Sequence, residues 1–145
     1  MAIATKFEEL LSWQRMHELN VEIIKATGNG PANRDFRFRD EIRDAADSAE
    51  RNVAEGFARY NPSVFANFLD YSRASAAETR SMLKKGLTCG YFSAEDFERL
   101  DRLAARGAQA VAKFQRYLRS PAAKRNAARR YSKTRAARRQ NDPNQ

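Results

Sequence analysis

The chain has 145 residues, of which 42% are hydrophobic and 31% are charged, and its formal net charge is +9. This length corresponds to one ordinary domain with a real hydrophobic core. No stretch approaches the roughly 18 apolar residues of a membrane span, and Glu8 and Glu9 stand where a secretory signal needs an apolar run. The single cysteine, Cys89, excludes an intramolecular disulfide. We therefore expect a cytoplasmic protein that makes no membrane contact.

The positive charge is concentrated near the C-terminus. Residues 121–145 contain eight basic side chains and one acidic side chain, whereas residues 1–120 contain 19 basic and 17 acidic ones. We therefore divide the chain into a body, residues 1–119, and a basic C-terminal tail, residues 120–145. Tyr131 is the only large apolar side chain of the tail. Such a segment cannot bury enough surface to order itself, so we predict a disordered tail, although its Ala and Arg content favours helix once the charge is neutralised.

The first expected helix covers residues 5–26 and has two apolar faces. A helix packed inside a monomeric bundle needs one apolar arc, so the wider arc indicates a contact between subunits. The alternative is a helix that is deeply buried within one bundle. One face consists of Leu10, Trp13, Val21 and Ile24, together with His17. The other face, to which we assign the subunit contact, consists of Met16, Leu19 and Ile23.

Three further helices follow a loop at residues 28–37. The second helix has a face of mostly small residues, which lets its neighbours come close. That face consists of Ile42, Ala45, Ala46, Ala49, Val53, Gly56 and Phe57. Asn61 and Pro62 begin the third helix, which reaches Thr88, and Ser93 begins the fourth, which reaches Leu118. No strand pattern appears, so we predict an all-α fold, an antiparallel up-down-up-down four-helix bundle.

Charged residues at four-residue spacing mark the solvent faces of these helices. The expected acid-to-base pairs are Asp47–Arg51, Glu55–Arg59, Glu95–Arg99 and Glu98–Arg102. The acidic cluster of Asp40, Asp44 and Asp47 is more simply a solvated face than a metal site.

Residues for catalysis or metal binding are scarce. One His and one Cys cannot make a common zinc site, and the Glu-x-x-His pairs of a di-iron bundle are missing. His17 is the only possible histidine base, and its apolar face indicates a core or interface residue. We therefore expect no catalytic residue, no metal and no cofactor, and predict that the protein is not an enzyme.

The second and third helices contain a recognisable pattern: an Ile, two Ala, a Ser, then Asn-x-Ala-Glu-Gly and an Arg. The residues are Ile42, Ala45, Ala46, Ser48, Asn52, Ala54, Glu55, Gly56 and Arg59, followed by Phe65, Phe68, Leu69, Ser75 and Glu78. This pattern resembles that of a bacterial four-helix-bundle family encoded in intervening sequences of large-subunit ribosomal RNA genes. The resemblance covers about residues 7–118.

The resemblance implies an antiparallel bundle that assembles into a ring-like homopentamer without catalytic activity. It also implies a relation to the accessory variability protein of diversity-generating retroelements, which binds nucleic acid and a reverse transcriptase. Four polar residues belong to the shared pattern: Asn52, Glu55, Ser75 and Glu78. We favour a structural role for them, in a buried hydrogen-bond network or at a subunit contact. The alternative is that they bind a ligand.

The basic residues carry the strongest functional signal. Eight cations in 25 residues, with Tyr131 available for stacking, suit phosphate contacts and RNA in particular; the alternative is a solubilising extension. Arginines near the second helix would extend this surface, although Arg43 and Arg59 are equally suited to ion pairs between helices. The predicted nucleic-acid-binding residues are Arg34, Arg37, Arg39, Arg43, Lys124, Arg125, Arg129, Arg130, Lys133, Arg135, Arg138 and Arg139.

The sequence therefore predicts a non-enzymatic homo-oligomer, pentameric by resemblance, that binds nucleic acid, with RNA favoured over DNA. The alternative is a protein-interaction scaffold that docks a partner such as a polymerase and has no nucleic-acid role.

Overall fold

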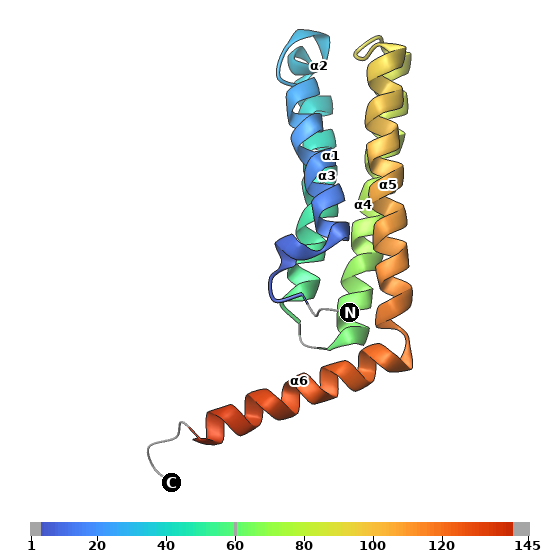
Figure 1. The fold of residues 1–145 in the computed structure, drawn as a ribbon. Coiled ribbons are helices and arrows are strands. Elements are labelled where there is room, and N and C mark those ends of the chain that lie inside the picture. Colours follow the sequence, from blue (N-terminus) through green and yellow to red (C-terminus); the bar gives the residue numbers. More distant parts are fainter. Residues whose placement is uncertain (1–3, 60, 141–145) are drawn as a thin grey trace.

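The computed structural model describes residues 4–59 and 61–140, which form an all-α fold without strands. The helices are η1 (Phe7–Glu9), α1 (Leu11–Ala26), α2 (Gly30–Arg34), α3 (Phe36–Phe57), α4 (Pro62–Thr88), α5 (Ala94–Leu118) and α6 (Pro121–Gln140). Figure 1 shows α1, α3, α4 and α5 lying alongside one another, with α6 leaving one end of this bundle. The prediction of an all-α fold is confirmed for these residues. None of the described helices combines the length and apolar character needed to cross a membrane.

Side-chain caps mark the starts of α4 and α5. The Asn61 side chain accepts hydrogen bonds from the backbone N–H groups of Ser63 and Val64, and Pro62 occupies the first turn of α4. The Ser93 hydroxyl accepts from the N–H of Asp96 at the start of α5. Both starts agree with the sequence prediction. The expected loop at residues 28–37 is instead interrupted by the short helix α2.

The face of small residues on α3 lies in the core, as predicted. Ile42, Ala46, Ala49 and Val53 have no solvent exposure. Gly56 allows the closest approach to α4, because a Cβ atom there would lie 2.9 Å from the Cβ of Phe68 and would also collide with a neighbouring aromatic ring. The small side chains thus bring the two helices together.

The prediction for α1 requires a correction. Met16, Leu19 and Ile23 are fully buried within the single chain, so they offer no surface to another subunit. A Cβ atom added to Gly107 of α5 would lie only 2.7 Å from the sulfur of Met16, so Met16 packs directly against α5. This contact places the face of α1 that contains Met16 in the core. The outward positions belong to the other face, where Ile24 is 46% exposed. The prediction was wrong because periodicity shows how wide an apolar arc is but not which part of it faces the neighbouring helices.

The C-terminal tail also differs from expectation, because residues 121–140 form helix α6. Its first turn is anchored: Ala123 is buried, its N–H donates to the Ser120 hydroxyl, and Asn126 donates to the Tyr117 hydroxyl at 3.1 Å. The Ala and Arg residues that follow are strong helix formers. The predicted disorder is therefore wrong for this segment, while residues 141–145 lie outside the described residues.

Candidate nucleic-acid interface

Three of the four predicted arginines in the body already have partners. Arg37 is paired with Glu41 at 2.9 Å, and Arg39 with Asp40 at 2.9 Å. Arg34 is exposed at the end of α2. These residues lie near α2, at the end of the bundle opposite α6 (Figure 1). The structure therefore does not bring them together with the basic residues of the tail.

Arg43 is held against the last turn of α1. Its Nε donates to the hydroxyl of Thr27 at 2.8 Å, and its Nη2 donates to the carbonyl oxygen of Ile24 at 3.3 Å. A guanidinium at this position satisfies a carbonyl that the end of a helix leaves unpaired and complements the helix dipole. Of the two roles open to Arg43 in the sequence, this geometry favours the one between helices.

The four polar residues of the shared pattern divide into two kinds. Asn52 donates to the carbonyl oxygen of Ser48 at 2.8 Å, and the Ser48 hydroxyl lies 2.8 Å from that of Ser75, so a short polar chain connects α3 with α4. Glu55 and Glu78 are exposed instead, and Glu55 lies 3.9 Å from a guanidinium nitrogen of α3. The structure thus links Asn52 and Ser75 but leaves both glutamates on the surface.

The histidine of α1 is exposed rather than buried in the core. The His17 ring stacks on Trp13 with their centroids 4.6 Å apart, and its Nδ1 lies 3.1 Å from a carboxylate oxygen of Glu50. The core alternative for His17 is therefore wrong, while the interface alternative stays a prediction.

Helix α6 presents the basic residues of the tail to solvent. The exposed ones are Lys124, Arg125, Arg129, Lys133, Arg135 and Arg139. The side chains of Arg130, Tyr131 and Arg138 lie outside the described part of the chain. No ion pair involves any of the six exposed cations within the described residues.

A second group of cations, which sequence reasoning missed, lies along the outer face of α5. This basic stripe consists of Arg102, Arg106, Lys113 and Arg116. All four are exposed, and none forms an ion pair or hydrogen bond with another described residue. The expected pair of Arg102 with Glu98 does not form, although that between Asp47 and Arg51 does, at 2.6 Å.

One sequence signal would have revealed the stripe. Asp101 is followed by 13 basic residues before the next acidic residue, Asp142. The boundary that we drew after residue 119 divided this run, and four-residue spacing to Glu98 made Arg102 look paired. All acidic residues of α5 lie in its first two turns, so only there can carboxylates of this helix neutralise neighbouring cations.

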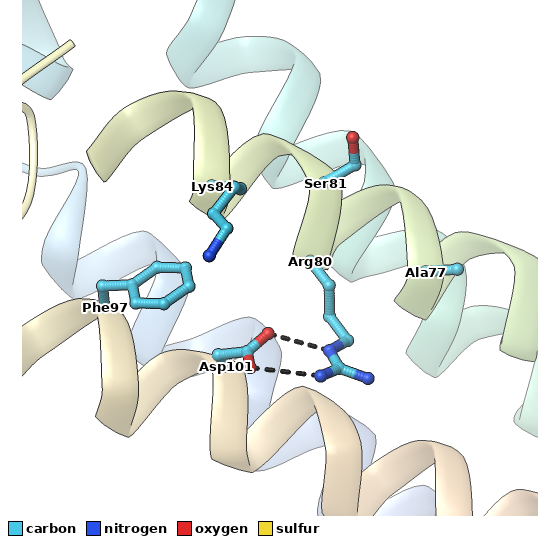
Figure 2. Close-up of a pocket in the computed structure, with 6 residues that line it drawn as sticks. All are labelled: Ala77, Arg80, Ser81, Lys84, Phe97 and Asp101. Atoms are coloured by element: carbon cyan, nitrogen blue, oxygen red, sulfur yellow. Dashed lines mark hydrogen bonds and ion pairs between the residues drawn. The ribbon is translucent and has the colours of Figure 1, made fainter. Parts of the chain in front are cut away.

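A shallow depression between α4 and α5 has a volume of about 340 Å³ (Figure 2). Arg80 donates two hydrogen bonds to the carboxylate of Asp101, at 2.8 and 3.1 Å, and Lys84 lies over the ring of Phe97, 5.0 Å from its centroid. Ser81 supplies the only hydroxyl among the lining residues, and no histidine is beside it. Its cations are already engaged, so the depression lacks the paired nucleophile and base of a hydrolytic site.

A second depression, of about 400 Å³, lies between α1 and α3. The carboxylates of Asp40 and Asp47 on its rim are paired with arginines of α3. Within residues 4–59 and 61–140, no three His, Cys, Asp or Glu side chains are grouped as metal ligands would be. The side chains of Asp40, Asp44 and Asp47 are exposed to solvent.

Comparison with known proteins identifies the family. The sequence model of the 23S rRNA-intervening sequence proteins matches residues 8–113. The chain belongs to this family. No curated protein matches it. The family match ends before Arg116, so α6 lies outside the shared region, and nothing about the tail is inherited from the family.

A solved structure shows the same fold as this family member. It is a protein of unknown function from the S23 ribosomal protein family of Bacteroides thetaiotaomicron. The two chains are 18% identical, and the alignment covers 76% of this chain and all of the other, with a TM-score of 0.67. At this identity the likeness establishes the shared fold alone.

Proposed function

We propose that this family member is a non-enzymatic, cytoplasmic protein that binds nucleic acid, RNA in preference to DNA, through helix α6. The carrying observation is that α6 presents six exposed cations and that no described carboxylate pairs with them. Helices with this composition attract polyanions, because each phosphate that is neutralised releases condensed counterions. The Arg-rich sequence favours RNA, which Arg-rich segments bind readily.

We further infer that the long helices form an antiparallel bundle. Hydrogen bonds between neighbouring helices support this topology. From one bonded pair to the next, the residue number rises on one helix and falls on the other, as it does for antiparallel neighbours. The pairs are Asn20–Glu50 and Thr27–Arg43 for α1 and α3, Ala49–Ser72 and Ser48–Ser75 for α3 and α4, and Ala66–Gln115 and Arg80–Asp101 for α4 and α5.

The proposal includes assembly into a homo-oligomer, with five subunits by family resemblance. The exposed side chain of Ile24 lies on the same face of α1 as the half-buried side chains of Trp13 and Val21, which supports an association surface there. Five tails would bring 40 basic side chains to one particle, because each tail holds eight. Avidity would then be high even where single contacts are weak.

Binding across a salt series tests the nucleic-acid proposal. We expect fluorescence anisotropy to show RNA binding by the full chain, with a log–log salt slope of about −0.7 to −0.9 per neutralised phosphate. Replacing the eight tail cations by Gln should flatten that slope. A full-length variant with Lys6, Arg15, Lys25 and Arg51 changed to Gln, all outside the proposed surface, serves as the control. Absence of binding by the unaltered chain at low salt would refute the proposal.

The second candidate is a protein-interaction scaffold that docks a partner such as a polymerase. The face of α1 that contains Ile24 and Trp13 favours it as well, because aromatic and aliphatic side chains gathered on one face suit the core of a protein interface. A stoichiometric partner that co-purifies with the chain, and is lost when Ile24 is changed to Ser, would support this candidate if RNA binding is absent.

A further inference from the structure

We propose that the basic stripe of α5 is a second nucleic-acid site, separate from α6, which binds the phosphate backbone of a double helix. This inference rests on the proposed function and adds both a site and a ligand class to it. The stripe is the set Arg102, Arg106, Lys113 and Arg116.

The four side chains form a straight track. Successive members are four, seven and three residues apart, so at about 100° per residue they fall within an arc of about 80° on α5. The track is about 21 Å long, since a helix rises about 1.5 Å per residue. Gln109 is exposed on the same face, between the second and third cations, and adds a neutral donor.

The charge of the stripe is not balanced by the neighbouring carboxylates. Asp101 directly precedes the stripe, but its carboxylate is turned toward α4 and accepts two hydrogen bonds from Arg80 (Figure 2). Glu98 forms no ion pair with a described residue and lies at the N-terminal border of the track. Between Arg102 and the end of α5 the sequence has no acidic residue. A polyanion laid along this face from Arg102 to Arg116 would therefore meet four cations and no carboxylate of α5.

The surface of the stripe favours a double helix over a single strand. Sites for single strands combine cations with exposed aromatic rings on which the bases stack. The large aromatic side chains exposed in the described chain are Phe36 on α3 and Tyr71 on α4, and none is on the outer face of α5. A straight row of cations matches the regularly spaced phosphates of a backbone, and contacts to phosphate carry no sequence information. A double helix offers a stiff backbone to match it.

The test compares four full-length proteins on a duplex RNA longer than the stripe and on one of its single strands. The stripe variant carries Arg102→Gln, Arg106→Gln, Lys113→Gln and Arg116→Gln, and Gln preserves helix propensity. A second variant replaces Arg102, Arg106 and Arg116 by Lys, which retains the charge. The control variant with changes at residues 6, 15, 25 and 51 loses four charges elsewhere. Light scattering gives the particle mass of each protein, and circular dichroism its helix content.

We expect the stripe variant to reduce the magnitude of the log–log salt slope on duplex by up to about 3.6, which is about 0.9 for each of four phosphates. The change on the single strand should be smaller, and the Lys variant and the control should keep the slope of the unaltered chain. If the unaltered chain binds but the stripe variant behaves like the control, the inference is wrong and the proposed function stands. A stripe variant with altered particle mass would also overturn it, because the face would then be a subunit contact. If the unaltered chain binds neither probe, the proposed function itself fails.

Discussion

At the scale of single residues, the tightest packing occurs at glycines that face other helices. Gly56 faces α4, and Gly107 faces Met16 of α1. The two sites differ in what a methyl group would meet. At Gly56 the obstacles are ring atoms and the Cβ of Phe68, whereas at Gly107 they belong to a flexible thioether.

We predict that Gly56→Ala destabilises the protein by about 1–3 kcal/mol, because the aromatic rings beside it cannot move away without strain. For Gly107→Ala we expect a change near zero, since Met16 can adopt another rotamer and Ala is the better helix former. Urea unfolding followed by circular dichroism measures both. Equal stability of the two variants would show that the rings beside Gly56 have room to shift.

A second residue-scale prediction concerns Asp35, whose carboxylate accepts a 2.6 Å hydrogen bond from the Tyr91 hydroxyl. This bond, with a further one from the N–H of Phe38, holds the pKa of Asp35 below its ordinary value. A lowered pKa in the folded state stabilises the protein above the unfolded pKa of an aspartate, about 3.9, and this contribution is lost as the pH falls through the folded pKa. Tyr91→Phe should raise the pKa of Asp35 toward its ordinary value and weaken the fall of Tm in acid. An unchanged acid dependence of Tm would contradict this account.

The sequence allowed some residue-scale features to be predicted and hid others. The caps at Asn61 and Ser93 were predicted because their signals are local, a few residues long. The contact between Asp35 and Tyr91 joins residues 56 positions apart, and only the packing of the α2–α3 junction against the α4–α5 turn creates it.

At the scale of elements, helices with one apolar face were predicted well and helices without one were not. The spans of α4 and α5 follow from their periodicity and caps. On α1 two apolar faces competed, and the sequence had no means to decide which of them faced the core. Helix α6 has no apolar stripe at all, so its helical state depends on intrinsic propensity and on the anchored first turn.

We predict that α6 is the least protected long helix against amide hydrogen exchange. Beyond its first two turns, every described side chain except that of Ala127 is exposed, and like charges three and four residues apart repel one another. Duplex RNA should increase the protection of residues 127–140 by neutralising this charge, with little change in α3. Exchange in α6 as slow as in α3 without RNA would show that another contact stabilises it.

At the scale of the whole molecule, a single chain leaves apolar surface of α1 exposed to solvent. Ile24 is 46% exposed, on the face of α1 that we had not assigned to subunit contact. If five chains of 16.5 kDa associate, the particle mass is about 82 kDa. Light scattering after size exclusion should give this mass, and Ile24→Asp should lower it. A mass near that of one chain would refute the assembly.

The uneven distribution of charge along the chain has a consequence for the rate of association with a polyanion. Residues 1–61 carry nine basic and eleven acidic side chains, whereas 13 basic and no acidic residues occupy positions 102–140. The molecule is therefore a strong electric dipole, whose positive end comprises the second half of α5 together with α6. If the chain binds a polyanion as proposed, the field of that polyanion would turn the dipole before contact, so that most encounters would begin with the basic end forward. Added salt would then act chiefly by slowing association, while the lifetime of the bound complex would change less.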